Sequence, residues 1–265
     1  MEKRFRTVEL SDPALESGGL RMMTVKSGAL RRRGDLTLWV PGRVTEGMPL
    51  VVLLHGVYGS HWAWAMKGAA HVTAAALMEA GEIPPMVLAM PSDGLWGDGS
   101  GYVRHASGED YERWVLDDVP AAVGMAVPEV TGESALFLAG LSMGGYGALR
   151  LAARSGGRVR AASGHSSVTD FRRLTVFVEE SLEACGVPEG ESALIDLMKR
   201  HRGELPPVRF DCGTEDPLLE DNRALRAALV AEGIPHEYEE SPGGHEWAYW
   251  RARVADSLRF FAAAL

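Results

Sequence analysis

Three features are scarce in this sequence, and each scarcity excludes a class of protein. The 265 residues include only two cysteines, too few for a disulfide framework and not spaced like a metal site. No stretch approaches the roughly 20 apolar residues that a membrane-spanning helix requires. Basic residues are outnumbered, 27 Lys and Arg against 36 Asp and Glu, for a net charge of −9. This charge disfavours a nucleic-acid partner, because affinity for phosphate depends on basic patches.

Apolar segments typical of strands alternate with amphipathic segments at helical spacing. This alternation predicts an α/β fold with a mostly parallel sheet covered by helices on both faces. Three of the predicted strands, 50–54, 86–90 and 135–139, are continuous apolar runs, as expected for strands buried on both sides, whereas the strand at 208–212 is interrupted by Arg209 and Asp211. In all, the predicted strands span 50–54, 86–90, 135–139, 159–163, 208–212 and 236–240, the last at an edge. About residues 4–40 predict two or three antiparallel strands at the N-terminal edge.

The remaining segments predict helices and one insertion. Apolar residues recur at spacings of three and four over 111–126 and 247–265, and a third helix is expected over about 218–232 before Gly233. The interval 169–207 is rich in charge and helix formers, and we expect it to form a small helical cap over the sheet. The whole chain, 1–265, is predicted to be a single domain.

The sharpest local motif is GLSMG, with Ser142 at its centre. It directly follows the predicted strand 135–139 and directly precedes the small residues of GYGALR. A strand, a Gly-x-Ser-x-Gly turn and a helix together form a nucleophile elbow, in which the serine hydroxyl projects above the sheet. Ser142 is therefore the candidate nucleophile, the alternative being an ordinary glycine-rich turn.

A serine hydroxyl needs a base to accept its proton, and histidine is suited to that role at neutral pH. On this fold the base follows the nucleophile and the acid in the chain, which removes four of the eight histidines. Of the four that remain, His245 lies in a loop after the last predicted strand and before the last helix. His245 is therefore the candidate base, against the alternative that it caps the final helix.

The imidazole must be held in one tautomer by a carboxylate. Asp216 lies in the loop after the strand 208–212 and just before Pro217, so it is the candidate acid. Glu215 is the runner-up, whereas Asp211 is still within the strand. The alternative role for Asp216 is an N-cap of the following helix.

Ester hydrolysis also builds negative charge on the carbonyl oxygen, which fixed N–H donors must stabilise. One donor is expected from Met143, the residue after the nucleophile. The second is expected from Val57, because Gly56 follows an early strand and lets the backbone turn this amide toward the site. His55 is interpreted as structural.

With these residues the chain resembles the esterase branch of the α/β-hydrolases that contains esterase D-like S-formylglutathione hydrolases, carboxylesterases, feruloyl esterases and mycolyltransferases. The matching stretches are LLHGVYGS, AGLSMGGYGALRLA, CGTEDPLL and GGHEWAYW, in the family's order. The resemblance implies the α/β-hydrolase fold and the same site residues, namely Ser142, Asp216, His245, Val57 and Met143.

Two positions concern the substrate. Tyr58 and Gly59 stand where S-formylglutathione hydrolases usually carry a Thr-Cys pair, which argues against glutathione thioesters. Tyr58 is a candidate substrate contact. Trp96 lies in a stretch that looks like the family's loop over the site, where it either lines the pocket or simply packs.

We therefore expect a serine esterase that acts on small to medium acyl esters through an acyl-enzyme, without a metal or organic cofactor. The alternatives are an acyltransferase with the same residues and an inactive hydrolase-fold binding protein. The expected partner is a small-molecule ester, and the sequence leaves open whether the chain forms a homo-oligomer. No apolar segment follows the charged N-terminus, so no secretory signal is visible and a cytoplasmic location is expected.

Overall fold

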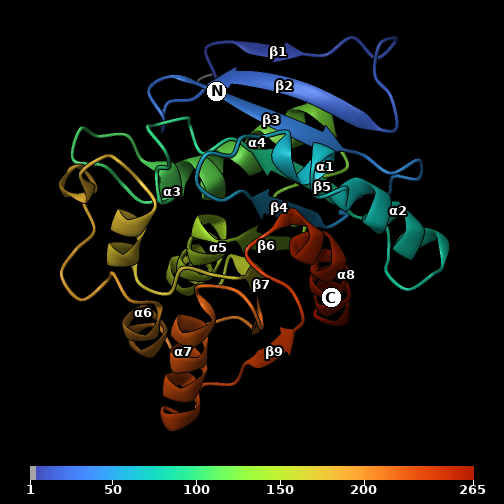
Figure 1. Ribbon diagram of the computed structural model, residues 1–265. Helices are drawn as coiled ribbons and strands as arrows, with labels where there is room; N and C mark the ends of the chain where they lie inside the picture. The colour runs from blue at the N-terminus through green and yellow to red at the C-terminus, as the bar shows by residue number, and fades with distance from the viewer. Residues whose placement is uncertain (1–3) are drawn as a thin grey trace.

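A computed structural model describes residues 4–265 of the chain (Figure 1). Within these residues the strands form one nine-stranded sheet in the order β1-β2-β3-β5-β4-β6-β7-β8-β9. The strands are β1 (Val8–Leu10), β2 (Leu20–Lys26), β3 (Arg33–Trp39), β4 (Leu50–Leu54), β5 (Val87–Pro91), β6 (Leu136–Leu141), β7 (Val159–His165), β8 (Val208–Gly213) and β9 (Glu237–Ser241).

The sheet is mostly parallel. The strands from β5 to β9 in this order pair in parallel, whereas β1, β2 and β3 add an antiparallel edge. The predicted mostly parallel α/β fold with antiparallel strands at the N-terminal edge is confirmed. Every residue of β4, β5, β6 and β8 is buried, as expected for strands with helices on both sides.

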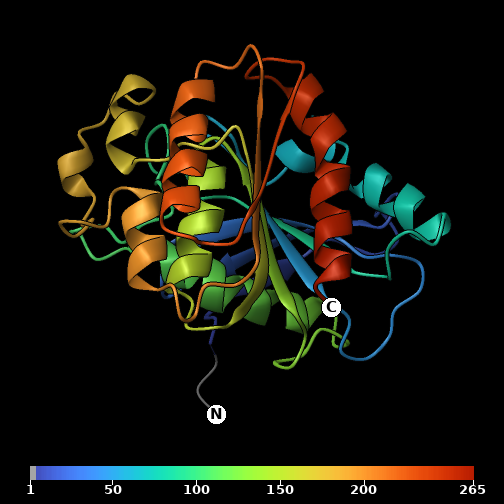
Figure 2. The same ribbon diagram turned by 90° about the horizontal axis from the view of Figure 1, so that it is seen from below.

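Helices cover both faces of the sheet (Figure 2). One face carries α1 (Ala63–Met66), α2 (Ala70–Glu79) and α8 (Trp247–Ala263). The other carries α3 (Tyr111–Arg113), α4 (Val119–Ala126), α5 (Met143–Arg154), α6 (Leu194–Arg200) and α7 (Leu219–Ala231). Two apolar cores result, one on each side of the sheet.

The prediction of one continuous α-helix over 111–126 is wrong for the middle of that segment. Between α3 and α4 the chain makes a π-helical turn, Trp114–Asp118, in which the Val119 amide bonds Trp114 five residues back. Pro120 explains the irregularity, because it has no N–H to donate to the carbonyl of Leu116. Arg158 donates to that carbonyl instead, at 2.6 Å.

The interval 169–207 contains less helix than its composition suggests. It consists of two 3₁₀ turns, Phe171–Val176 and Leu182–Ala184, followed by α6, which packs on α5. The first turn ends beside Phe177, which reaches the site described below. The cap role of this interval and the single-domain organisation stay predictions.

Candidate active site

Ser142 lies at the sharp reversal between β6 and α5. Its backbone has φ 54° and ψ −119°, a conformation that costs energy for a residue with a side chain. The two glycines of the motif make the reversal sterically feasible. A Cβ on Gly140 would sit 2.2 Å from the Gly144 carbonyl oxygen, and one on Gly144 would sit 2.3 Å from the Leu54 carbonyl oxygen.

Three backbone hydrogen bonds hold Ser142 in this strained conformation. Its amide donates to the His165 carbonyl at 2.9 Å, and its carbonyl accepts from the amides of Tyr146 and Val168 at 3.1 Å each. β6 lies between β4 and β7, with Gly140 opposite Leu54 in the register. The hydroxyl is therefore presented at the carboxyl edge of the sheet, beside the loop that follows β4.

The loops that carry the acid and the base meet because β8 and β9 are neighbours. Gly213, the last residue of β8, pairs with Ser241, the last residue of β9. The two loops then approach closely: the Glu215 amide donates to the Gly243 carbonyl at 3.0 Å. A Cβ on Gly213 would lie 2.1 Å from that same oxygen, so only glycine permits this approach.

The structure brings Ser142, His245 and Asp216 into one hydrogen-bonded line. His245 Nε2 lies 3.0 Å from Ser142 Oγ, and His245 Nδ1 lies 2.9 Å from Asp216 Oδ2 and 3.1 Å from Oδ1. Because a carboxylate only accepts, Nδ1 carries the proton and Nε2 is free to accept from the serine hydroxyl. Glu215, the runner-up for the acid, is exposed and lies outside this line.

Asp216 is buried, and its surroundings favour the charged form. Burial alone would raise the pKa of its carboxyl, but the hydrogen bond from His245 and the electrostatic attraction between the two groups outweigh burial and lower the pKa. The Leu218 amide adds a further hydrogen bond to Oδ1 at 2.8 Å. Asp216 therefore contacts the histidine and also accepts a hydrogen bond within the turn before α7, whose N-cap residue is Leu218 rather than Asp216.

The two candidate oxyanion amides come from two different segments beside the nucleophile. Met143 is the first residue of α5, so helix geometry leaves its amide without an intrahelical acceptor. Val57 follows Gly56, where a Cβ would lie 3.2 Å from the Ser142 Cβ. In residues 4–265 neither amide donates a hydrogen bond to the protein. Both are therefore available to a ligand.

His55 is structural, as expected. Its Nδ1 donates to the Gly56 carbonyl at 2.7 Å, and its Nε2 accepts from the Asp93 amide at 3.1 Å. Gly59 packs against the same imidazole, with no room for a Cβ beside Nδ1. The buried ring thus holds the turn that presents the Val57 amide.

A cavity of about 450 Å³ opens onto Ser142 and His245. Five large aromatic side chains from three parts of the chain line this cavity: Tyr58, Trp62, Phe177, Trp247 and Trp250. Tyr58 lines the cavity as predicted for a substrate contact. Trp96 does not line it, and its ring packs edge-on against His105 at 4.5 Å between centroids.

Sequence reasoning missed Trp62 and Phe177 as cavity residues. Trp247 and Trp250 belong to the apolar repeat that predicts the helix over 247–265, and the structure shows that they also line the cavity. Trp247 and Trp250 lie two and five residues after His245, so their nearness to the base was a usable signal. Phe177 carried no such signal, because its segment has no motif.

His165 also follows Ser142 in the chain, but its imidazole forms its hydrogen bonds outside the candidate site. His165 is fully buried, with Nδ1 2.9 Å from Asp211 Oδ2 and Nε2 2.9 Å from Ser257 Oγ. Asp211 also accepts from Arg209 and from the Tyr249 hydroxyl. This is a second His-Asp pair, but it is sealed in the core, away from substrate.

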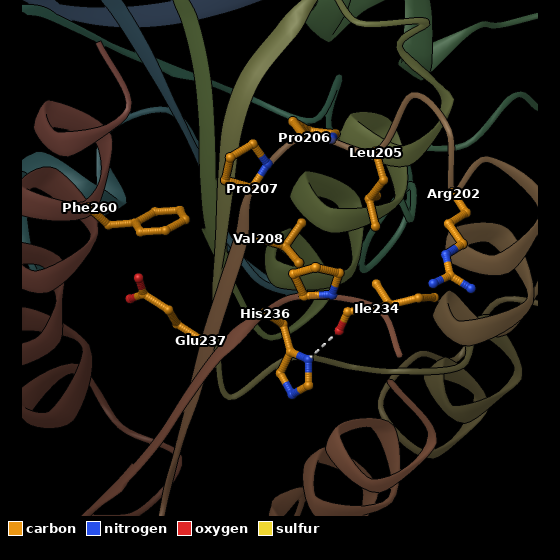
Figure 3. Close-up of a pocket in the computed structure, with 10 residues that line it drawn as sticks. Arg202, Leu205, Pro206, Pro207, Val208, Ile234, His236, Glu237 and Phe260 are labelled. Carbon is orange, nitrogen blue, oxygen red and sulfur yellow. Dashed lines mark hydrogen bonds between the residues drawn. The ribbon is translucent and has the colours of Figure 1, made fainter. Parts of the chain in front are cut away.

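A second cavity, of about 420 Å³, lies at the opposite edge of the sheet (Figure 3). It opens beside Val208 and Glu237, the first residues of β8 and β9, whereas the candidate catalytic residues follow the carboxyl ends. Its histidine, His236, bonds the Ile234 carbonyl at 2.9 Å. It contains neither a nucleophile nor a paired acid and base, so it is not the candidate site.

Two negative findings concern membrane-spanning helices and metal sites among the described residues. Among the helices of residues 4–265, none combines the length and apolar character needed to cross a bilayer. In the same part of the chain, no three His, Cys, Asp or Glu side chains gather in a way that could hold a metal ion. Cys185 and Cys212 are free and buried.

The sheet order, the serine at a strand-to-helix reversal and the positions of Asp216 and His245 define an α/β-hydrolase fold. Residues 27–261 match the model of the Esterase family, described as "Putative esterase". The chain belongs to this family, and the class of enzyme that the family and the fold define is the serine esterase.

Individual relatives agree with this assignment. An acetyl esterase from Caldicellulosiruptor saccharolyticus is 26% identical over 239 residues, 82% of this chain and 85% of that protein. Among solved structures, a ferulic acid esterase superposes with a TM-score of 0.78 at 21% identity, covering 98% of this chain and 100% of the other. The fluorophosphonate-binding serine hydrolase FphF from Staphylococcus aureus superposes with a TM-score of 0.77 at 22% identity, covering 91% of this chain and 97% of the other. At these identities the two structures support the fold alone.

Proposed function

We propose that this chain hydrolyses carboxylic esters of small to medium acyl groups through an acyl-enzyme formed on Ser142. The observation that supports the proposal is the unbroken contact from Ser142 Oγ to His245 Nε2 at 3.0 Å and from His245 Nδ1 to Asp216 at 2.9 Å. This line lies at the wall of a cavity of about 450 Å³, within the range of small-molecule sites.

In the first half-reaction, Ser142 Oγ attacks the ester carbonyl carbon while His245 Nε2 accepts its proton. The carbonyl oxygen becomes negatively charged and is stabilised by the amides of Val57 and Met143. The bond to the alcohol oxygen then breaks, and His245 returns the proton to that oxygen. The alcohol leaves, and the acyl group stays on Ser142.

In the second half-reaction, water takes the place of the alcohol. His245 accepts a proton from the water as it attacks the acyl carbon, and the same two amides stabilise the oxyanion. The bond to Ser142 breaks, His245 returns the proton to Oγ, and the carboxylic acid is released. Throughout the cycle Asp216 holds the imidazole in the required tautomer and stabilises its charged form.

The direct test is hydrolysis of nitrophenyl esters from acetate to octanoate by the parent and by Ser142→Ala. We expect a burst of nitrophenol equal to the enzyme concentration in the parent, and covalent labelling by a fluorophosphonate. Both should disappear in Ser142→Ala and persist in Ser134→Ala, a loop serine before β6. An active Ser142→Ala variant would remove the proposal, and an added alcohol acceptor separates hydrolysis from acyl transfer.

A further inference from the structure

Tyr58 is an unusual residue in the loop that carries the candidate oxyanion amide. It directly follows Val57, its backbone has φ 59°, and its side chain is largely exposed. A bulky residue in the left-handed region is strained by about 1–2 kcal/mol, a cost that glycine would avoid. Such strain calls for a compensating interaction of the side chain.

The compensating interaction joins Tyr58 to the segment that follows β7. The Tyr58 hydroxyl donates to the carbonyl of Phe177, which lies 119 residues later in the chain and directly after the turn Phe171–Val176. Partial desolvation at this contact, with the nearby carboxylates of Asp98 and Glu179, raises the pKa of Tyr58, which further favours the protonated, donating hydroxyl.

Three further hydrogen bonds reinforce this junction through Asp98. The Tyr58 amide donates to the Asp98 carbonyl at 2.8 Å. The Asp98 carboxylate in turn accepts from the Glu179 amide at 2.9 Å, and the Asp98 amide donates to the Glu180 carboxylate at 3.1 Å. The oxyanion loop, the loop around Asp98 and the segment 177–180 are therefore fastened together; we call these contacts the Tyr58 clasp.

The clasp contacts the backbone that carries the Phe177 ring. This ring is a wall of the cavity and lies nearly parallel to the His245 imidazole, at an interplanar angle of 8° and 6.4 Å between centroids. The opposite walls come from α1 and the start of α8, which are packed into the core. Phe177 is thus the wall whose position depends on a surface segment rather than on the sheet.

We propose that Tyr58 is a positioning residue: its hydroxyl, through the Phe177 carbonyl, holds the Phe177 ring against the site and so limits the size of the ester that the enzyme accepts. The inference rests on the proposed esterase function. It makes Phe177 the specificity-determining contact, and Tyr58 acts on selectivity through Phe177 rather than through the substrate.

The test is a double-mutant cycle with Tyr58→Phe, Phe177→Ala and the combined variant. The readout is the ratio of kcat/KM for nitrophenyl octanoate to that for nitrophenyl acetate. We expect Phe177→Ala to raise this ratio by about tenfold and Tyr58→Phe to raise it by about threefold. The double variant should match Phe177→Ala alone, because residues that act through one contact are not additive.

Tyr238→Phe is the matched control, since its hydroxyl bonds Glu240 at 3.1 Å on the distant strand β9. It should leave the ratio unchanged. A Tyr58→Phe ratio equal to that of the parent would overturn the proposal, as would additive effects in the double variant. If Tyr58→Phe merely weakens the fold, kcat should fall for both esters and the ratio should stay constant. That result would also count against the proposal.

Hydrogen exchange separates this inference from the esterase function itself. Tyr58→Phe should speed amide exchange at residues 178–180 by about threefold or more, and Tyr238→Phe should not. Unchanged exchange in Tyr58→Phe would overturn the clasp whatever the enzyme hydrolyses. Absent ester hydrolysis together with absent fluorophosphonate labelling of the parent would instead refute the proposed function.

Discussion

The indole ring of Trp250 stands perpendicular to the imidazole of His245, with 5.0 Å between the ring centroids. The indole N–H donates to Ser166 Oγ at 3.2 Å, which fixes the direction of the ring. Ser166 itself has φ 46° and donates its amide to the Asp211 carbonyl at 2.7 Å. Two contacts therefore orient the His245 imidazole: the hydrogen bond from Nδ1 to Asp216 and the packing of the ring against the Trp250 indole.

Loss of the indole N–H should slow catalysis without abolishing binding. Trp250→Phe keeps an aromatic ring but frees it to turn, and a small displacement of the base should lower kcat by about tenfold with little change in KM. Trp39→Phe is the control, because its indole bonds the Gly18 carbonyl at 3.0 Å near the antiparallel edge. Equal kcat values for the two variants would show that Trp250 does not orient the histidine.

Asp216→Asn should reduce kcat by about 10⁴-fold. An amide at this position can donate to Nδ1 and so select the wrong imidazole tautomer, leaving Nε2 protonated and unable to accept from Ser142. Glu215→Gln, one residue earlier and exposed, should retain the parent kcat. Steady-state kinetics with nitrophenyl acetate decide between them, and the opposite pattern would make Glu215 the acid.

Gly144→Ala should destabilise the protein by about 3 kcal/mol or more, because the new Cβ would meet the Leu54 carbonyl oxygen at 2.3 Å and backbone atoms cannot yield cheaply. Gly132→Ala is the matched control, since a Cβ there has no neighbour within 4 Å. Urea unfolding of the two variants measures the difference. A Gly144→Ala protein as stable as the control would mean that the turn is looser than described.

Acid should weaken the fold through Asp211. Burial alone would raise the pKa of this carboxyl, but His165 and Arg209 lower it below its ordinary value. Below about pH 4 the unfolded chain therefore binds more protons than the folded chain. The stability that Asp211 contributes is present above that pH and is lost as the pH falls through the lower pKa of the folded state.

Asp211→Asn tests this predicted dependence of stability on pH. At about pH 7 we expect a free energy of unfolding about 3 kcal/mol below that of the parent, because Arg209 loses a buried partner. Between about pH 4 and pH 2 the variant should lose stability less steeply than the parent. Urea unfolding across this range provides the measurement, and identical slopes would exclude Asp211 as a source of acid lability.

Much of this arrangement could be predicted because it is encoded locally or by chain order. The Gly-x-Ser-x-Gly turn requires glycine at fixed spacing, and the carboxyl ends of parallel strands share one edge, so Ser142, Asp216 and His245 could be placed before their distances were known. The family and the mostly parallel sheet are confirmed. The catalytic roles of these residues stay predictions until the variants are measured.

Other features escaped because they depend on contacts between distant segments. Nothing near Phe177 in the chain indicates that it lines the cavity, since its contacts there, such as the hydrogen bond from the Tyr58 hydroxyl to its carbonyl, come from distant segments. Trp96 could not be placed for the same reason: a tryptophan in a loop finds its partner, here His105, only when the loops pack. The π-helical turn before Pro120 could have been anticipated, because a proline removes one backbone donor at a known position.

The amino-acid sequence by itself determined which elements form and in what order, because turn chemistry and apolar periodicity act over a few residues. Only the tertiary structure decided the walls of the cavity and the orientation of the base. Those depend on side chains such as Trp250 and Phe177, which are brought to His245 by packing between segments far apart in the chain.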